Sequence, residues 1–496
     1  MPGLGLSACV LLAACADIGG IASHRLPVDA RQLDGGEALG GHTAADGTPL
    51  SVAGWPQAQW WSGFGDTQLD ALIARAVAGN PHLKAAQDRV DSARAATEAA
   101  EDVLGPGVDA EGLSRRLRYS SNHIFPAPLG GGEYWENQLN LKFIYNFDIW
   151  GGDRQAVEAA LGRQRASELE ARAARLALES AVVRAYVDYS LACALHEELE
   201  AEVEQRRQII DLTRRLREAG LVADLQLSQV QAQLPLLHAR LDASESAIEQ
   251  SRYALAALAG EGPGAGEMLG TPALSLEAAL DLPQAAPAVL IGRRPDVVAQ
   301  RWRVEAAGHG VEAMRTRFYP NFDLHGLIGL QALSFNKLLQ PDSAAWELGP
   351  AFTLPYFRGE ELRARLHGST AQFDLAVDAY DAAVIGALHE AADALSARRG
   401  AEAQNRDTRD AVDAAQRAYD QAHEGFEAGL TGYLDVLQAQ TALFTAREAL
   451  VRSSAARLQT QAALMQALGG GFDEQLEAQT QAAHSTPVDA TPEHAS

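Results

Sequence analysis

The stretch Tyr134–Gly152 reads YWENQLNLKFIYNFDIWGG and alternates apolar with polar side chains over most of its length. Successive side chains of a β-strand point to opposite faces, so this pattern predicts a strand with one apolar face and one polar face. Asn137 is the one polar side chain on the apolar face. The side chains expected to meet lipid are Trp135, Leu139, Leu141, Phe143, Tyr145 and Phe147.

Composition and charge exclude several classes of protein. The chain has 496 residues, of which 47% are hydrophobic and 21% charged, which is typical of a folded protein. Its formal net charge of −24 argues against a nucleic-acid partner, because phosphate binding needs clustered Lys and Arg. Three cysteines provide no disulfide framework.

The N-terminus is predicted to be a signal peptide. An apolar run of about eleven residues, Leu4–Ala14, is too short to span a bilayer as a helix. It ends in Leu12-Ala13-Ala14-Cys15, which is similar to a bacterial lipobox, where Cys15 would be lipidated and become the first mature residue. The alternative is an ordinary Ala-rich cleavage site, and no Lys or Arg precedes the run. No later segment has eighteen consecutive apolar residues, so we expect no transmembrane helix in the mature chain.

The chain contains an internal repeat. Residues 81–113 and 295–327 agree at eleven of 33 positions without gaps, and residues 218–234 and 427–443 agree at eight of seventeen. Each half therefore has one order: a helix, a proline-marked entry to a strand, a second strand, a very long helix, a Gly-Leu turn and another helix. The repeat predicts four long strands in two hairpins.

The second half has its own alternating stretches, residues 322–330 and 346–356. In the latter, Trp346 and Phe352 are expected on the lipid side. In the partner strand of the first half, residues 108–119, the apolar residues change from one alternating set of positions to the other near Gly112. This change indicates a bulge or a wrong strand assignment.

The predicted helices are very long. No proline occurs between Gly152 and Gln233, and a helix over residues 153–219 would be about 100 Å long at 1.5 Å per residue. The heptad spacing supports a coiled-coil-like seam of small and mixed residues, which suits a helix with neighbours on both sides. The seam consists of Leu169, Ala173, Leu176, Ser180, Val183, Val187, Ser190 and Ala194.

Four such strands cannot form a closed membrane structure alone. Unpaired strand edges in lipid cost several kcal/mol per polar group, and about eight strands make the smallest common barrel. We therefore expect several copies of the chain to complete one barrel by rotational symmetry, with the number of copies left open. The alternative is a soluble antiparallel sheet packed on helices by one face.

Several motifs, in this order and spacing, resemble the TolC-like outer-membrane efflux factors over about residues 55–468. Within that family the similarity is to the lipoprotein (NodT) branch that serves resistance–nodulation–division (RND) pumps. The motifs are WWSGFGDTQLDALIARAVAGNPHLKAA (60–86), NFDIWG (146–151), IGRRPDVVAQ (291–300), RFYPNFDLHG (317–326), WELGPAFTLPYF (346–357) and EAGLTGYLDVLQAQTAL (427–443).

The resemblance implies an α+β membrane protein that forms a homotrimer. Each chain would contribute four strands to a shared transmembrane β-barrel of twelve, and its long helices to a periplasmic α-barrel. The protein would be the exit duct of a tripartite efflux pump in the bacterial outer membrane, lipid-anchored and extending into the periplasm. It would passively conduct small molecules or drugs delivered by an inner-membrane RND-type pump and a periplasmic adaptor, without a cofactor.

The Gly-Leu turns fall where the family's helix pairs turn at the periplasmic tip. The segments expected to contact the adaptor are residues 217–226 and 426–436, and in particular Arg217, Gly220, Leu221, Asp224, Gly429, Leu430 and Tyr433. Asp224 is also a further acidic candidate on the first turn. Asp435 matches a position where the family often places a carboxylate of the pore constriction, and Gln438 stands where a second carboxylate is common. A symmetric ring of Asp435 would favour cations. The alternative is a solvated aspartate near the positive end of a helix dipole. A departure from the family is Arg358-Gly359-Glu360-Glu361, where relatives commonly carry more glycine or basic residues.

Two other functions fit the sequence less well. An enzyme is disfavoured because His389-Glu390 lacks the second His of a metalloprotease motif, and no GxSxG, P-loop or CxxC is present. We therefore expect no catalytic, metal or cofactor-binding residue. A lipid-anchored periplasmic coiled-coil adaptor or structural spacer would share the long helices, but it has no need of lipid-facing strands.

These patterns together predict the organisation of the chain. The expected parts are a lipoprotein signal peptide (1–14), an anchored linker (15–60), a first repeat (61–265), a linker or equatorial segment (266–290), a second repeat (291–468) and a disordered tail (469–496).

Overall fold

The computed structural model describes residues 18–29, 33, 59–277, 294–355 and 357–472. The chain divides into two compact units. Unit 1 comprises residues 1–27, 89–168 and 299–381, and unit 2 comprises residues 28–88, 169–298 and 382–496. Cys9 and Cys15, with the predicted signal peptide, lie outside the described residues.

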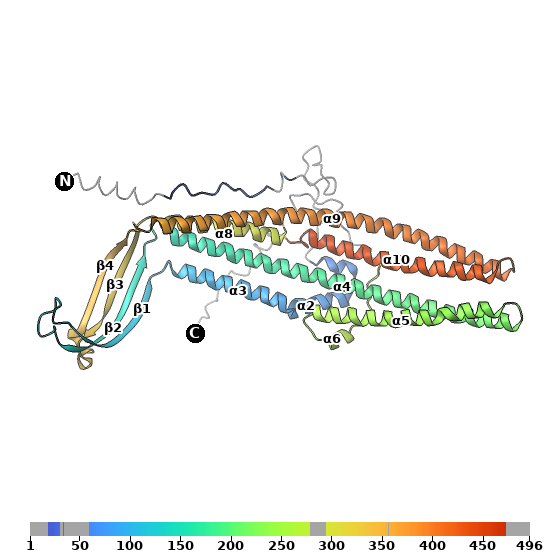
Figure 1. Ribbon diagram of the computed structural model, residues 1–496, viewed down its shortest axis with the longest axis horizontal. Coiled ribbons are helices and arrows are strands. Elements are labelled where there is room, and N and C mark those ends of the chain that lie inside the picture. Colours follow the sequence, from blue (N-terminus) through green and yellow to red (C-terminus); the bar gives the residue numbers. More distant parts are fainter. Residues whose placement is uncertain (1–17, 30–32, 34–58, 278–293, 356, 473–496) are drawn as a thin grey trace, which may run out of the picture. The chain divides into compact units, whose positions relative to one another are not determined.

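Unit 1 contains a four-stranded antiparallel sheet in the order β1-β2-β3-β4 (Figure 1). The strands are β1 (Gly107–Arg118), β2 (Glu133–Asn146), β3 (Asn321–Ala332) and β4 (Ala344–Thr353). The prediction of four strands in two hairpins, one hairpin from each half of the chain, is confirmed. Strands β1 and β4 are the two edges of the sheet, and among the described residues no further strand lies beside their outer backbone groups.

The register corrects the predicted bulge in the first strand. From Gly107 opposite Ile144 to Arg118 opposite Glu133, β1 pairs with β2 without a break. The change of apolar parity near Gly112 has another cause. Beyond that point the apolar face of β1 carries polar side chains that find partners across the strands: Ser114 bonds Asn137, and Arg116 pairs with Glu133.

The register places the predicted lipid-facing side chains on one face. Leu141 lies opposite Ile328, which lies opposite Trp346, and all three are exposed in the single chain. No helix of the described part of the chain covers this face, and Trp346 is 79% exposed. A soluble sheet would bury such a face against its helices, so the bare face argues against the soluble alternative.

The predicted strand around Phe147 ends earlier than expected. Strand β2 ends at Asn146, so Phe147 lies one residue beyond it, although its backbone N–H still donates to the carbonyl of Phe322 at 3.2 Å. On the other side of the sheet, β4 ends at Thr353. The chain turns towards the helices at both points, which ends the strand pairing.

The helices repeat in length as well as in order. Helices α3 (Pro81–Asp102) and α8 (Pro295–Thr316) each have 22 residues, and α5 (Asp224–Leu258) and α10 (Tyr433–Ala467) each have 35. The two long helices are α4 (Gly152–Glu218) and α9 (Gly359–Glu427), with 67 and 69 residues. The predicted long helix over residues 153–219 is therefore confirmed. Among the described residues, no helix combines the length and hydrophobicity needed to cross a membrane.

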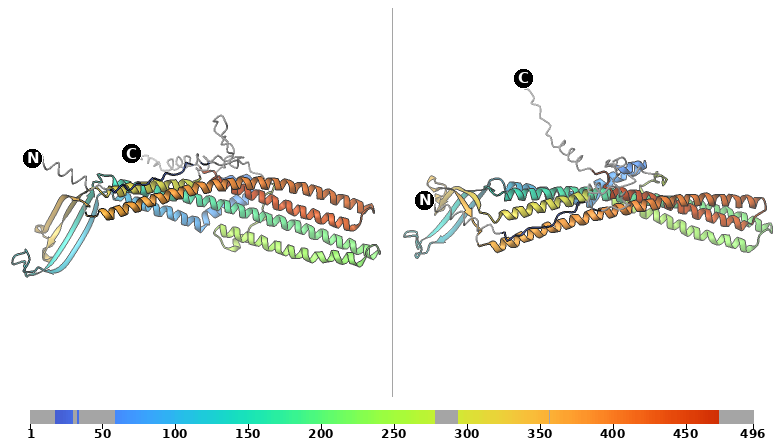
Figure 2. Two further views of the ribbon diagram at one scale, coloured as in Figure 1. Left: turned by 45° about the horizontal axis from the view of Figure 1, so that its top comes forward. Right: turned by 90° about the horizontal axis from the view of Figure 1, so that it is seen from above.

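In unit 2 the helices pack as two antiparallel pairs, α4 with α5 and α9 with α10 (Figures 1 and 2). The predicted seam of α4 is buried at its centre, where Ser180, Val183 and Val187 have no exposed surface. Small residues at these positions allow the close approach of neighbouring helices.

The same core packs α4 against the short elements η3 (Trp60–Phe64) and α2 (Thr67–Gly79) and against the segment that follows α6 (Pro263–Glu267). The carboxylate of Asp66 accepts hydrogen bonds from the Gln68 backbone at 2.9 Å, the Tyr186 hydroxyl at 2.7 Å and the Ala273 backbone at 2.9 Å. Burial and the bond to Asp66 raise the pKa of Tyr186. This network fastens the segment after α6 to α2 and α4.

The predicted disordered tail begins too early. Phe472 is buried, and the backbone N–H groups of Gly469 and Gly470 bond to the last turn of α10. These glycines have positive φ angles, which end the helix and turn the chain back onto the core. Residues 473–496 lie outside the described part.

Candidate functional site: the sheet faces and the two tip turns

The polar face of the sheet carries a continuous ladder of side-chain hydrogen bonds. Arg115 donates to Glu136 at 2.6 Å, Gln138 donates to Glu136 at 2.8 Å, and Asn140 donates to Gln138 at 3.2 Å. Lys142 adds an ion pair with Glu111. One face of the sheet therefore carries hydrogen-bonded polar side chains, and the other carries exposed apolar side chains. A sheet between water and lipid needs this arrangement.

The NFDIWGG segment joins β2 to α4. The Asp148 carboxylate accepts hydrogen bonds from the backbone N–H groups of Asp153 at 2.9 Å and Arg154 at 3.1 Å, and so caps the start of α4. The indole of Trp150 donates to the carbonyl of Pro320 at 2.8 Å and stacks on Tyr319 at 4.8 Å. The signature residues of the two repeats therefore meet at the junction between strands and helices.

The junction between β4 and α9 lacks such an aspartate cap. Arg358 instead forms a two-pronged ion pair with Glu361, with both distances 2.9 Å. Glu360 and Glu361 lie in the first turn of α9, where negative charge is favoured by the helix dipole. The sequence Arg358-Gly359-Glu360-Glu361, which departs from the family pattern, thus starts α9 with an ion pair and acidic side chains.

The first tip turn (residues 217–226) and the second tip turn (residues 426–436) have one geometry. Gly220 has φ +74° and Gly429 has φ +71°, in the left-handed region. The N–H of Leu221 donates to the carbonyl of Leu216, and that of Leu430 donates to Gly425. This is a Schellman motif, which explains why each helix pair turns at Gly-Leu.

The two tip turns expose apolar side chains. Four leucines, two in each turn, are between 62% and 83% exposed: Leu221, Leu225, Leu430 and Leu434. The predicted contact segments include all four leucines, although only Leu221 and Leu430 were named individually. Leu225 and Leu434 occupy equivalent positions of the repeat.

The predicted contact residues of the tip turns do not all face outward. Arg217 and Asp224 are exposed and form an ion pair at 3.6 Å. Tyr433, in contrast, is half-buried and packs against Phe426 at 5.5 Å, and burial raises the pKa of its hydroxyl. An inward-facing Tyr433 packs the turn together, so its assignment as a direct contact is not supported by its position.

Asp435 begins the helix after the second tip turn. Its carboxylate accepts a hydrogen bond from the backbone N–H of Gly432 at 3.0 Å. Gln226, the equivalent residue of the first repeat, does the same for Ala223 at 2.8 Å. Asp435 and Gln438 are both exposed. Asp435 thus caps the start of α10, and its side chain is also exposed to solvent, as a residue of a pore constriction would be.

Polar side chains connect the two helix pairs near the tip turns. Arg240 of α5 reaches Glu202 of α4 at 3.7 Å and Glu448 of α10 at 2.8 Å. Gln440 of α10 donates to Gln205 of α4. Beside them, Arg206 is almost wholly buried, and burial lowers its pKa. The first and second repeats are therefore joined here by charge and hydrogen bonds rather than by apolar packing alone.

In unit 1, the segment 18–27 lies along the first part of α9. Ile18 and Ile21 pack against a core that includes Leu362 and Leu366, near the start of that helix. Further along, Ser23 bonds Asp374 and Arg25 pairs with Asp378. The described chain therefore begins close to the junction between β4 and α9.

Two repeats that each combine a strand hairpin with a long helix pair define the architecture of an outer-membrane channel subunit. Residues 72–261 and 286–470 match the family described as "Outer membrane efflux protein". The chain belongs to this family, a family of channel proteins, and is an outer-membrane efflux channel.

Individual relatives agree with this assignment. The chain is 39% identical to the fusaric acid resistance protein FusA of Burkholderia cepacia, over 74% of this chain and 68% of that one. It is 30% identical to the multidrug resistance outer membrane protein MdtP of Escherichia coli (strain K12), over 86% and 89%. The crystal structure of the outer membrane protein VceC from Vibrio cholerae superposes with a TM-score of 0.77 at 32% identity, covering 84% of this chain and all of that one.

Proposed function

We propose that three copies of this chain form one outer-membrane duct. The observation that carries the proposal is the sheet, which has a bare apolar face, a satisfied polar face and two unpaired edge strands. Edge β1 of one copy would pair with edge β4 of the next, which satisfies the backbone groups that lipid cannot. Twelve strands would then enclose water with the polar ladder on the inside.

The tip turns would meet a periplasmic adaptor, which connects the duct to an inner-membrane RND-type pump. Exposed leucines at the ends of both helix pairs support this, because exposed apolar patches mark protein contacts. Their contact would be apolar, flanked by the charged side chains of Arg217 and Asp224. The energy for transport would come from the pump, so the duct itself would be a passive conduit without enzyme activity.

Asp435 would line the constriction at the tip. Three copies of an exposed carboxylate in a ring would focus negative potential and favour cations over anions. Gln438, one turn further along the same helix, would line the ring above or below it without adding charge.

Cys15 would carry a lipid that anchors the chain in the outer membrane. The packing of Ile18 near the start of α9 supports this, because Ile18 is only three positions after Cys15, a reach of about 10 Å. Metabolic labelling with a palmitate analogue tests it. Label should enter the wild-type protein and be absent from Cys15→Ser, whereas equal labelling of both would refute the anchor.

Fractionation and gel mobility test the duct against a lipid-anchored periplasmic adaptor or spacer. A duct should migrate as a trimer that heating converts to a monomer, whereas a lipid-anchored spacer, which detergent would also release from the membrane, should not. The duct should also conduct ions in a planar bilayer. A species that is washed off by salt, or that never forms a heat-sensitive trimer, would contradict the proposal. Deletion of the gene with susceptibility profiling, and co-purification, would then identify cargo and adaptor.

A further inference from the structure

Asn137, the polar side chain on the apolar face of β2, is only 1% exposed. Its side-chain carbonyl accepts a hydrogen bond from the Ser114 hydroxyl at 2.7 Å. Its amide group donates to the backbone carbonyl of Trp135 at 2.9 Å. The carboxamide is therefore held in one orientation beneath the surface.

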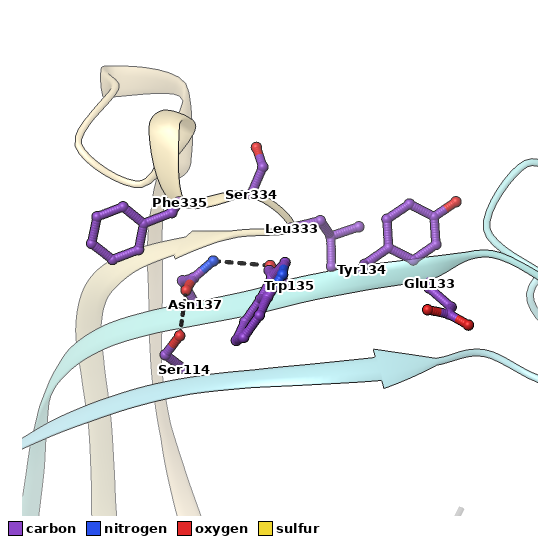
Figure 3. Close-up of a pocket in the computed structure, with 8 residues that line it drawn as sticks. All are labelled: Ser114, Glu133, Tyr134, Trp135, Asn137, Leu333, Ser334 and Phe335. Carbon is purple, nitrogen blue, oxygen red and sulfur yellow. Dashed lines mark hydrogen bonds between the residues drawn. The ribbon is translucent and has the colours of Figure 1, made fainter.

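Asn137 is part of the floor of a pocket of about 440 Å³ (Figure 3). Its volume is within the range of small-molecule sites, about 300–1,000 Å³. The lining residues come from β1, β2 and the segment that follows β3: Ser114, Glu133, Tyr134, Trp135, Asn137, Leu333, Ser334 and Phe335. Figure 3 shows the Trp135 and Phe335 side chains on either side of Asn137.

The pocket lies at the hairpin-loop end of the strands, on the apolar face. Ser114, Trp135 and Asn137 share that face by register, and the long helices begin at the opposite strand ends. This inference rests on the proposed function, in which the apolar face meets lipid and the helices are periplasmic. The pocket then faces the outer leaflet of the outer membrane.

The chemistry of the pocket favours a sugar. Two aromatic rings offer faces on which the apolar C–H side of a sugar ring can stack, and Glu133 and Ser334 offer hydrogen-bond partners for its hydroxyls. No Lys or Arg is among the eight described lining residues, so the pocket itself offers no cation to a phosphate, and the nearby Arg116 is already paired with Glu133. The polar floor of Ser114 and Asn137 is a poor match for an acyl chain.

We propose that this pocket binds a sugar ring of an outer-leaflet glycolipid, lipopolysaccharide. Stacking on Trp135 and Phe335 would hold the ring, and Glu133 and Ser334 would bond its hydroxyl groups. The lipid part would lie along the apolar face below, beside Leu139 and Leu141.

Binding to the detergent-purified, full-length trimer tests the proposal, with native mass spectrometry as the readout. Three probes are used: intact rough lipopolysaccharide, its oligosaccharide with the lipid removed, and a sugar-free phospholipid. Intact lipopolysaccharide should bind, the free oligosaccharide should compete at least tenfold more weakly, and the phospholipid should not displace the glycolipid. Equal competition by the phospholipid would overturn the sugar site, and equal affinity of the free oligosaccharide would overturn the glycolipid as its source.

Variants locate the site. Trp135→Ala and Phe335→Ala should each weaken lipopolysaccharide binding at least tenfold. Trp346→Ala removes an exposed tryptophan of the same face that does not line the pocket, and should leave binding unchanged. Equal losses in all three variants would overturn the assignment. Trimer formation is measured in the same samples. If the wild-type chain forms no heat-sensitive trimer, the proposed function is wrong. If it forms a trimer that binds no glycolipid, only this inference is wrong.

Discussion

Asp148 shows how one side chain organises a junction. It stands at φ +41°, which aspartate tolerates better than most residues, and its two carboxylate oxygens take up the free N–H groups at the start of α4. Trp150 then ties this junction to the one between α8 and β3 in the second repeat. The strand thus passes into a helix of 67 residues within a few positions.

Replacing Asp148 tests its role as a cap. Asp148→Ala should lower the free energy of unfolding by about 1–2 kcal/mol, since two backbone donors lose their acceptor. The control is Glu158→Ala, which removes an exposed carboxylate of the same helix. The midpoint of chemical unfolding, followed by circular dichroism, should fall for the first variant and stay constant for the second. Equal midpoints would show that α4 does not depend on this cap.

Asp435 allows a charge test at a single position. Asp435→Asn keeps an oxygen that can accept the hydrogen bond from Gly432 but removes the charge, so the turn should persist. If three carboxylates form a ring, cation selectivity and divalent-ion block should both decrease, as measured by single-channel reversal potentials in a salt gradient. Asp224→Asn, at the exposed first tip turn, is the matched control and should change them less. Unchanged selectivity in Asp435→Asn would leave Asp435 with its capping role only.

At the scale of elements, the helix pairs depend on glycine at their turns. Gly220 and Gly429 have open space where a Cβ would stand, so a substitution there meets no neighbour. The cost lies in the backbone, because a left-handed φ is unfavourable for residues with a Cβ. The turn is therefore specified by conformation and not by packing.

Gly429→Ala should destabilise the second tip turn by about 1–2 kcal/mol. Gly368→Ala is the control, because Gly368 is exposed within α9 and also faces open space. Alanine at this helical position should stabilise the protein by up to about 1 kcal/mol. Amide hydrogen exchange across residues 425–436 should be faster in the first variant only. Unchanged exchange in Gly429→Ala would mean that the turn is not limited by its left-handed residue.

At the scale of the whole molecule, the two faces of the sheet should respond differently to charge. Leu348 and Gly349 are neighbours on β4 that point to the apolar and the polar face. Leu348→Arg should cost about 2–4 kcal/mol at the bilayer centre and reduce the heat-sensitive trimer in outer membranes. Gly349→Arg should retain the trimer and alter its conductance. Equal trimer yields for both variants would show that the apolar face does not meet lipid.

The strands and helices were largely predictable, because their patterns depend on local backbone geometry. Alternation at a period of two identified β2, β3 and β4, and freedom from proline together with heptad spacing identified α4 and α9. The repeat added independent support, since each half predicts the other. The candidate site was predicted less completely, because the sequence indicated the two segments but not which of their side chains are exposed. Leu225 and Leu434 are exposed, whereas Tyr433, which was named as a contact residue, is half-buried.

By itself, the sequence determined the order of the elements, the alternating faces of the strands and the glycine turns, all of which follow from the conformational preferences of neighbouring residues. Only the tertiary structure decided that β1 pairs without a bulge, that Asn137 lies beneath a pocket and that Tyr433 turns inward. The physical reason is that pairing and burial depend on residues that are distant along the chain. Ser114 lies 23 positions from Asn137, and Gln205 lies 235 positions from Gln440. No local pattern records which distant side chain will be the partner.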